Sequence, residues 1–282
     1  MSAGQPLRFS KMHGAGNHFV VLDRRGGRPA PTPALLRALG DPHTGIGFDQ
    51  LLTIEDAPRP GIVARYGIYN RDGSTAGQCG NGARCVAAWL QRDGAARGDR
   101  FLLDSPAGEI AVERLPDGRY RLAMGVPSFD PARIPMRLPA ADEYVLDAGG
   151  EALRFGAVSM GNPHAVVEVP SARRADVARL GPALQARPEF PEGVNVGFAE
   201  VLAPDRLRLR VFERGAGETL ACGSGACAAV AVLVRQGRVD RAVQVELPGG
   251  TLAITWPADD APITMAGPAT FVFEGEFAVA TP

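Results

Sequence analysis

Two cysteines of this chain stand in nearly identical settings. Cys79 and Cys222 each begin a C-G-[NS]-G-A sequence that leads into a largely apolar stretch, as a buried helix would. Backbone N–H groups and the dipole at such a helix start favour an anion, and therefore a thiolate over a thiol. A thiol facing a thiolate can remove a proton from one side of a carbon and deliver one to the other. The pair therefore predicts a two-base inversion of a stereocentre.

The predicted chemistry needs neither a cofactor nor a metal. Without pyridoxal phosphate, a desolvated site and convergent N–H donors must stabilise the carbanion that forms at an amino acid α-carbon. The C-x₅-C spacing of Cys79 and Cys85 and the C-x₄-C spacing of Cys222 and Cys227 do not match common zinc sites. Cys85 and Cys227 lie inside the expected helices, where we expect them to be small buried hydrophobes.

The two settings belong to a longer internal repeat. Residues 79–94 align without gaps with residues 222–237, and eight of the sixteen positions are identical. Three shorter matches lie upstream in the same order: Ile68–Arg71 with Val211–Arg214, Gly16-Asn17 with Gly161-Asn162, and Gln50 with Asn195. This spacing is much longer than that of a solenoid repeat, so the chain is predicted to contain one module twice.

Amide side chains recur at these matched positions, where a zwitterion could use both their donors and their acceptors. They are Asn17, Gln50, Asn70, Asn81, Asn162 and Asn195. The modules differ where the first has Asn70 and the second has Glu213, which Arg214 follows. A carboxylate for an ammonium group and a guanidinium for a carboxylate favour a charged amino acid as substrate.

The elements that must position these residues are mostly strands. We expect an α+β protein of two pseudo-symmetric modules, each a mainly antiparallel, barrel-like sheet around one central helix. The first module spans residues 1–122 and is completed by 268–282, the second spans 123–267, and the active site lies in the cleft between them. The expected strands are Phe19–Asp23, Ile62–Asn70, Phe101–Leu103, Glu109–Arg114, Ala165–Val169, Leu207–Phe212 and Val243–Leu247. The expected helices are Ala83–Arg92 and Ala226–Gln236, ended by Gly94 and Gly237, with loops at Pro29–Pro33 and Pro131–Pro139.

At these residues the sequence resembles the diaminopimelate epimerases, which are pyridoxal-phosphate-independent amino-acid racemases. The motifs that carry the resemblance are KMHGAGNHFVVLD, GFDQ, YNRDGSTAGQCGNGARC, MGNPHAV, GVNVGF and FERGAGETLACGSGACA, in this order along nearly the whole chain. The resemblance implies interconversion of LL- and meso-diaminopimelate in lysine and peptidoglycan-precursor biosynthesis. It also implies a homodimer and a substrate enclosed between two domains.

Carried over by position, the resemblance implies that Cys79 and Cys222 transfer the protons and that His164 lies near the reacting centre. The substrate-binding set that it implies is Asn17, Gln50, Asn70, Gly80, Asn81, Asn162, Asn195, Glu213, Arg214, Gly223 and Ser224. Two positions depart from the family pattern: His18 replaces the usual Asp of GNDF, and Gln78 replaces a common Met. We expect His18 to alter the surroundings of Asn17 without abolishing binding.

The amino-acid composition limits the classes of partner that the chain is expected to bind. Thirty Lys and Arg against thirty-one Asp and Glu leave a net charge of −1, which argues against nucleic acid or an anionic membrane. No signal-peptide pattern opens the chain, and its longest apolar run, Ala226–Val234, is too short to span a bilayer. We therefore expect a cytoplasmic protein.

Several alternatives remain. A proline or hydroxyproline racemase would use the same chemistry, but such relatives typically carry CGHG at the first cysteine, where this chain has CGNG. A non-catalytic amino-acid-binding module, or a same-fold isomerase without the cysteines, conflicts with the retention of both Cys79 and Cys222. A disulfide between these two cysteines would remove both bases. The GAGNHF stretch lacks the third glycine of a dinucleotide-binding turn and precedes a strand.

Overall fold

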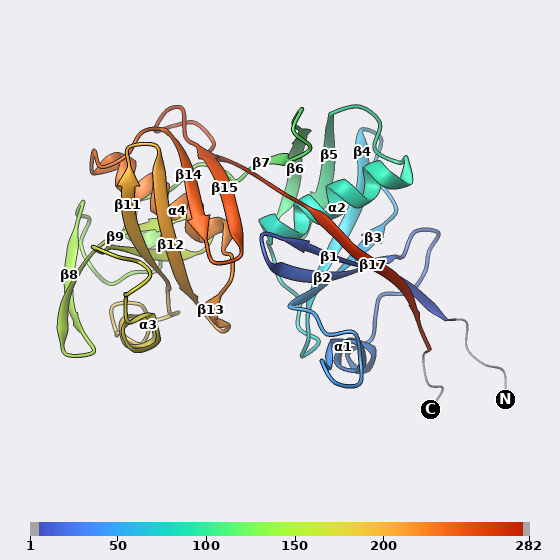
Figure 1. Ribbon diagram of the computed structural model, residues 1–282, viewed down its shortest axis with the longest axis horizontal. Coiled ribbons are helices and arrows are strands. Elements are labelled where there is room, and N and C mark those ends of the chain that lie inside the picture. The colour runs from blue at the N-terminus through green and yellow to red at the C-terminus, as the bar shows by residue number, and fades with distance from the viewer. Residues whose placement is uncertain (1–5, 279–282) are drawn as a thin grey trace. The chain divides into compact units, whose positions relative to one another are not determined.

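The structure is a computed structural model that describes residues 6–278 (Figure 1). The chain divides into two compact units, Met1–Leu122 with Gly267–Pro282, and Ala123–Ala266. The first unit is thus built from both ends of the chain, because strand β17 (Thr270–Phe277) pairs with strand β1 (Leu7–Gly14). Residues 1–5 and 279–282, which the sequence assigns to the first module, lie outside the described residues.

The sheet of the first unit runs in the order β17-β1-β2-β3-β4-β5-β6-β7. The β2–β3 and β4–β5 pairs are parallel and the other pairs are antiparallel. The remaining elements are β2 (Asn17–Asp23), α1 (Pro33–Gly40), β3 (Gln50–Glu55), β4 (Ile62–Asn70), α2 (Gly80–Asp93), β5 (Arg100–Ser105), β6 (Gly108–Arg114) and β7 (Tyr120–Ala123).

The sheet of the second unit runs in the order β8-β9-β10-β11-β12-β14-β15-β16, and the short β13 pairs with the end of β12. Here the β10–β11 and β12–β14 pairs are parallel. The elements are β8 (Tyr144–Ala148), β9 (Glu151–Ser159), β10 (Pro163–Glu168), α3 (Val177–Gln185), β11 (Asn195–Ala203), β12 (Arg206–Glu213), β13 (Gly217–Thr219), α4 (Gly223–Arg235), β14 (Ala242–Leu247), β15 (Gly250–Thr255) and β16 (Thr264–Gly267).

The two units repeat one another element by element, which confirms the predicted pseudo-symmetric modules. The parallel β2–β3 pair is joined through α1, and the parallel β10–β11 pair through α3. The matched residues fall at the same strand ends: Gln50 begins β3 as Asn195 begins β11, and Asn70 ends β4 as Glu213 ends β12. The repeat in the sequence is therefore a repeat of strand ends, where side chains are free to meet a ligand.

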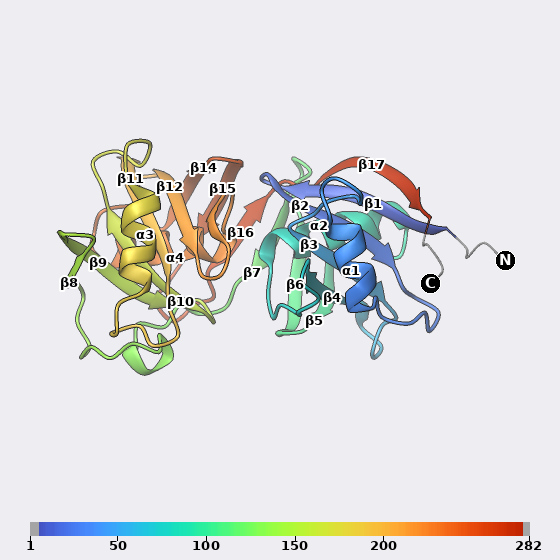
Figure 2. The ribbon, with the colours of Figure 1, turned by 90° about the horizontal axis from the view of Figure 1, so that it is seen from below.

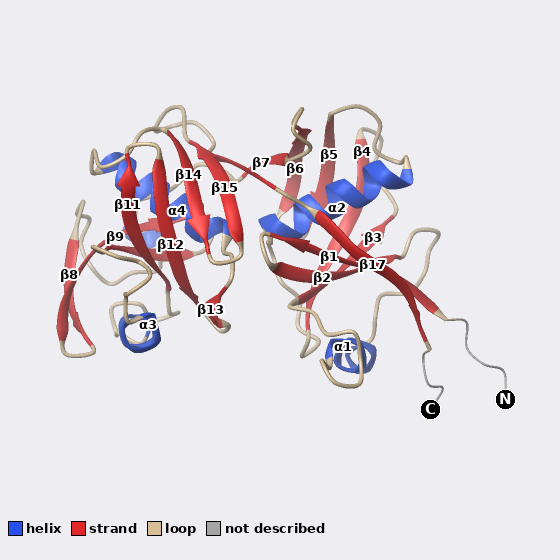
Figure 3. Cartoon of the chain, viewed as in Figure 1, coloured by secondary structure: helices blue, strands red, loops and turns tan. Residues whose placement is uncertain are grey.

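Each of the seven expected strands overlaps an observed strand, and strands predominate in both units (Figure 3). Each module also contains a second helix, α1 or α3, that the sequence did not indicate. α1 begins at Pro33, inside the expected loop Pro29–Pro33, because Thr32 caps it by accepting a hydrogen bond from the Leu35 N–H (3.2 Å). In the other expected loop, Pro131–Arg133 form one turn of 3₁₀ helix.

The two cysteine-bearing helices start earlier than expected, at Gly80 and Gly223. α4 is buried along nearly its whole length and contacts β9, β10, β11, β12 and β15, so strands surround it as the sequence predicts. α2 is buried at Cys85, Val86 and Leu90, while Trp89 and Gln91 remain partly accessible. Gly94 ends α2 in the left-handed conformation (φ 82°) that glycine tolerates.

The second pair of helices packs against the sheets by one apolar face each (Figure 2). Leu36 and Leu39 of α1 pack with Val20 and Leu51, and Leu180 and Leu184 of α3 belong to the core that contains Phe198. Among residues 6–278, no helix combines the length and the apolarity that crossing a bilayer requires.

Candidate active site

The first cysteine sits at the N-terminus of α2 and is partly exposed. Cys79 is the N-cap residue, and its Sγ accepts a hydrogen bond from the Gly82 N–H at 3.4 Å. The Asn17 Oδ1 atom lies 3.8 Å from this sulfur and 3.4 Å from the Asn81 Nδ2 atom. Two of the predicted amides therefore meet at this thiol, one from the start of β2 and one from the first turn of α2.

The other two predicted amides of the first unit contact each other. The Gln50 Nε2 group donates to Asn70 Oδ1 at 3.1 Å, and the Asn70 Nδ2 group donates to Ser74 Oγ at 2.9 Å. Gln50 and Asn70 are paired across β3 and β4, and the neighbouring β2 begins at Asn17. Three adjacent strand ends thus present Asn17, Gln50 and Asn70 along one edge of the sheet.

The second cysteine is buried beside a carboxylate. Cys222 is 4% exposed, and its Sγ donates to Glu213 Oε2 at 3.1 Å. Glu213 also accepts a hydrogen bond from the Thr219 hydroxyl, while Ser224 Oγ lies 3.6 Å from the sulfur. Burial, and then the charge of Glu213 and its hydrogen bond, raise the pKa of Cys222 well above its usual value. The expectation that a helix start favours a thiolate is therefore wrong for Cys222, which is a thiol.

His164 is fully buried and uncharged, and it is connected to this thiol through Asn162 and Ser224. Its Nε2 atom lies 3.0 Å from Asn162 Oδ1, and the Asn162 Nδ2 group donates to Ser224 Oγ at 3.4 Å. Burial, assisted by the charge of Arg214, lowers the pKa of His164 to about 3. With this amide orientation Nε2 carries the ring proton, so His164, Asn162 and Ser224 form a neutral hydrogen-bonded chain that ends at Cys222.

Asn195 joins two strand ends through backbone groups. It is 4% exposed, its Nδ2 group donates to the Pro163 carbonyl at 2.9 Å, and its Oδ1 atom accepts from the Arg214 N–H at 2.9 Å. The Arg214 guanidinium donates to the Glu192 carbonyl at 2.9 Å. In this structure Asn195 therefore positions Arg214, and direct contact between Asn195 and substrate stays a prediction.

Each unit thus carries one half of the predicted site. Gly80 and Asn81 form the first turn of α2, and Gly223 and Ser224 form the first turn of α4. Reasoning from the sequence missed three residues that hold predicted ones: Thr219 contacts Glu213, Asp49 contacts Asn17, and Arg84 contacts Asn81. Asp49 directly precedes Gln50 in GFDQ, and Thr219 precedes Cys222 by three residues. Their proximity to the motifs is the sequence signal that could have identified them.

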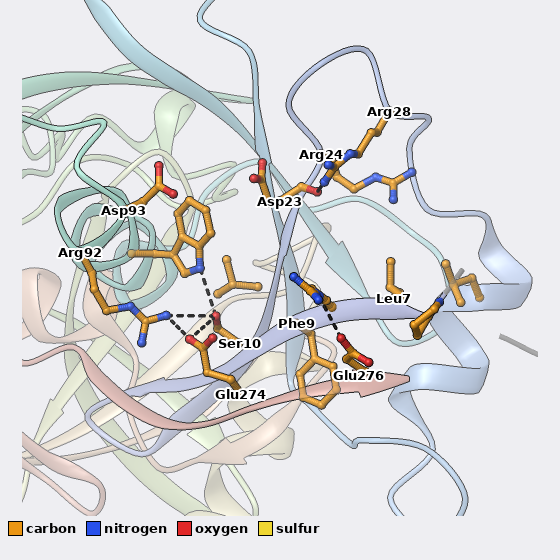
Figure 4. Close-up of a pocket in the computed structure, with 15 residues that line it drawn as sticks. Leu7, Phe9, Ser10, Asp23, Arg24, Arg28, Arg92, Asp93, Glu274 and Glu276 are labelled. Atoms are coloured by element: carbon orange, nitrogen blue, oxygen red, sulfur yellow. Dashed lines mark hydrogen bonds and ion pairs between the residues drawn. The ribbon is translucent and has the colours of Figure 1, made fainter. Parts of the chain in front are cut away.

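In the described part of the chain, neither a metal-ligating cluster nor the cavity over β1 points to another site. No group of three or more His, Cys, Asp or Glu side chains within residues 6–278 could hold a metal ion. A cavity of about 870 Å³ lies over β1 and the end of α2, away from the predicted site residues (Figure 4). At its rim, Arg92 is paired with Glu274 and Arg8 with Glu276. The carboxylates offset the charge of these two arginines, which weakens their attraction for an anionic ligand.

The fold matches solved structures of low sequence identity. A PhzF-family phenazine biosynthesis protein from Bacillus anthracis superposes with a TM-score of 0.70 at 16% identity, covering 98% of this chain and 100% of that chain. A hydroxyproline epimerase from Agrobacterium vitis superposes with a TM-score of 0.68 at 19% identity, covering 100% of this chain and 95% of that chain. These matches show the fold, and the match to the diaminopimelate epimerase family makes the chain an isomerase of the amino-acid epimerase class.

Sequence comparison then identifies the family. The chain belongs to the diaminopimelate epimerase family, whose sequence profile matches residues 9–129 and 156–272. It is 63% identical over 273 residues to the diaminopimelate epimerase of Xanthomonas axonopodis pv. citri, covering 96% of each chain. It is 58% identical over 272 residues to that of Xylella fastidiosa, again covering 96% of each. The resemblance seen in the motifs is confirmed, and the proline racemase alternative is set aside.

Proposed function

We propose that this protein interconverts LL- and meso-2,6-diaminopimelate by moving one proton at the α-carbon, with Cys79 and Cys222 as the two proton-transfer groups. The observation that carries the proposal is the pair of equivalent helix starts, each preceded by a cysteine: Cys79 lies near the amide of Asn17, and Cys222 lies beside Glu213 and Ser224. The reaction would serve lysine and peptidoglycan-precursor synthesis. We also propose that the enzyme works in the cytoplasm as a homodimer.

The two units would share the work of recognising a doubly zwitterionic substrate. Glu213 is the carboxylate nearest to a catalytic thiol and can accept hydrogen bonds from an ammonium group, while the Arg214 guanidinium can bind a carboxylate. The amides Asn17, Gln50, Asn70 and Asn162 add neutral donors and acceptors that do not compete for the α-proton. Backbone N–H groups at Gly80-Asn81 and Gly223-Ser224 are placed to stabilise the charge that develops on the reacting carboxylate.

One proton would leave the substrate carbon on one face, and a different proton would replace it on the opposite face. One thiolate takes the α-proton and leaves a carbanion, and the S–H group of the other cysteine then protonates the opposite face. After one turnover the first sulfur carries the proton and the second is a thiolate, so the reverse reaction uses the opposite roles. Cys222 is a thiol before substrate binds, so it is the acid in the first direction.

Solvent-deuterium incorporation at the α-carbon tests this function. Reduced wild-type protein should incorporate deuterium into diaminopimelate and convert the LL form to the meso form, and free proline should not exchange. Absence of exchange with diaminopimelate would contradict the substrate, and exchange with proline would restore the racemase alternative.

Mild oxidation tests whether the two sulfurs meet. If both cysteines contact one carbon, they can approach closely enough to form a disulfide, and oxidation should abolish activity until a dithiol is added. Peptide mapping should then find Cys79 linked to Cys222 and neither helix-interior cysteine involved. Activity that resists oxidants would count against two sulfurs facing one carbon.

A further inference from the structure

Two amides of the first half-site are held end to end between a carboxylate and a guanidinium. The Asn17 Nδ2 group donates to Asp49 Oδ2 at 2.7 Å, and the Asn81 Nδ2 group donates to Asn17 Oδ1 at 3.4 Å. At the other end the Arg84 Nη2 group donates to Asn81 Oδ1 at 2.8 Å. The hydrogen bonds therefore all run in one direction, from Arg84 towards Asp49.

The two charged ends decide which way each amide faces. An ionised carboxylate only accepts hydrogen bonds and a guanidinium only donates them, whereas an amide can be turned over to do either. Asp49 therefore requires the nitrogen of Asn17, which turns the Asn17 carbonyl oxygen towards Cys79 Sγ at 3.8 Å. Arg84 requires the oxygen of Asn81, which leaves the Asn81 nitrogen for Asn17.

Both charged ends are themselves anchored. Arg84 is fully buried, and its Nε group donates to the Pro268 carbonyl at 3.2 Å. Asp49 accepts from the His18 N–H at 2.9 Å and lies 3.2 Å from His18 Nε2, while Lys11 Nζ lies 2.8 Å from His18 Nδ1. His18, the departure from the family pattern, thus connects the Lys11 ammonium to the Asp49 carboxylate.

We propose that Asp49 and Arg84 are positioning residues that hold the amides of Asn17 and Asn81 in one orientation, so that a carbonyl oxygen and not an N–H group faces Cys79. The role of Cys79 as a proton-transfer group rests on the proposed function, whereas the orientation itself does not. The pKa of Asp49 agrees with this arrangement. Partial burial alone would raise that pKa, but hydrogen bonds from His18 and Asn17 hold it below its usual value.

The second half-site shows that this orientation is not inherent in the repeat. Asn162, the counterpart of Asn17, contacts His164 through its oxygen and turns its nitrogen towards Ser224 beside Cys222. Its outer partner is a neutral imidazole, and the residue that matches Asp49 in the repeat is Val194. The carboxylate is therefore what distinguishes the amide beside Cys79 from the amide beside Cys222.

The variant Asp49→Asn tests the proposal because it keeps the size of the side chain and removes the obligate acceptor. Its amide can donate to Asn17 as well as accept, so Asn17 is free to turn its N–H group towards Cys79 and stabilise a thiolate there. We expect iodoacetamide to alkylate Cys79 several-fold faster in this variant, because the thiolate is the reactive form. Cys85, Cys222 and Cys227 are buried, so the fast phase reports Cys79.

Turnover provides the second measurement. The loss of one charge-assisted hydrogen bond behind Asn17 should lower kcat on diaminopimelate about tenfold and leave KM within about twofold, since the ground-state contacts remain. The matched control is Asp41→Asn, in the same segment between α1 and β3. The Asp41 carboxylate accepts hydrogen bonds from the His43 and Thr44 N–H groups but does not contact Asn17. We expect the control to match the wild type in both assays.

The outcomes separate the two proposals. An unchanged or slower alkylation of Cys79 in Asp49→Asn would overturn the positioning role, whatever the activity. A parallel change in Asp41→Asn would assign the effect to the loop as a whole and would also overturn it. A wild-type protein that does not act on diaminopimelate would contradict the proposed function, while faster alkylation in Asp49→Asn would still support the orientation of the amides.

Discussion

The starts of helices α2 and α4 come from one repeated sequence, yet they place their cysteines in opposite electrostatic surroundings. Cys79 is partly exposed among neutral amides, and the Gly82 N–H donates to its sulfur. Cys222 is buried and donates to the Glu213 carboxylate. The comparison shows that a shared helix start does not by itself set the protonation state of a thiol.

Substitutions at matched positions of the repeat account for the difference. The first unit has Asn70, Asn81 and Arg84 where the second has Glu213, Ser224 and Cys227. The first unit therefore carries a buried cation near its helix start, and the second carries an anion against its thiol. The proposed two-base reaction needs one acid and one base at any moment, and this asymmetry would make Cys222 the acid before substrate binds.

Removal of either sulfur should have the largest effect. We expect Cys79→Ala and Cys222→Ala each to lower epimerisation at least about a thousandfold, because each removes the group that the proposed mechanism assigns to one face of the α-carbon. Conversion of LL- to meso-diaminopimelate measures the effect. Cys85→Ala and Cys227→Ala are the matched controls, because these thiols are buried inside the same helices. Full activity in Cys222→Ala would contradict the two-base mechanism.

Removal of the carboxylate beside Cys222 should make the two half-sites more alike. In Glu213→Gln the pKa of Cys222 should fall relative to the wild type, because one of the causes that raise it is lost. The thiolate absorbance should then appear at lower pH in a Cys79→Ser background, with the Cys79→Ser/Cys222→Ser variant as the blank. We expect kcat to drop about ten- to a hundredfold, since a charge-assisted hydrogen bond and a contact to substrate are lost together. An unchanged titration would mean that burial alone keeps Cys222 a thiol.

The buried histidine of the second unit predicts a pH dependence of stability. His164 keeps a pKa of about 3 in the folded protein against 6.5 in the unfolded chain, so between these values only the unfolded state binds the proton. The free energy of unfolding should therefore fall as the pH is lowered, by about 2–3 kcal/mol between pH 7 and about pH 4.5. Denaturant unfolding measures it, and His164→Gln should show a shallower slope. Equal slopes would indicate that His164 is protonated in the folded state.

The smallest effect should come from a matched pair of glycines. A Cβ atom at Gly225 would lie 3.0 Å from Val211 Cγ2 and 3.2 Å from Cys222 Sγ, whereas one at Gly82 would lie 3.1 Å from Leu52 Cδ2 and 3.5 Å from Cys79 Sγ. Leu52 can move its methyl group, but the β-branched Val211 is stiff. Gly225→Ala should therefore cost about 1 kcal/mol of stability and some activity, while Gly82→Ala should be nearly neutral. Thermal unfolding and kcat of the two variants measure these effects. A larger loss in Gly82→Ala than in Gly225→Ala would contradict the prediction.

The sequence by itself determined the pseudo-symmetric repeat and the cysteine that precedes the central helix of each unit. These follow from local rules: a glycine-rich turn before an apolar stretch starts a buried helix, and alternating β-branched residues form strands. These local rules did not predict helices α1 and α3. α1 follows a proline-rich stretch of the kind that is typical of loops. α3 contains Pro182, and proline is normally unfavourable inside a helix.

Only the tertiary structure decided what each cysteine is chemically. Glu213 and Cys222 are nine residues apart, and their contact depends on β12 ending beside the first turn of α4. Asn17 and Cys79 are 62 residues apart, and Asp49 reaches Asn17 only because β2 and β3 pair in parallel. The protonation of a thiol depends on burial and on charges within a few ångströms, and no spacing in the sequence specifies those distances.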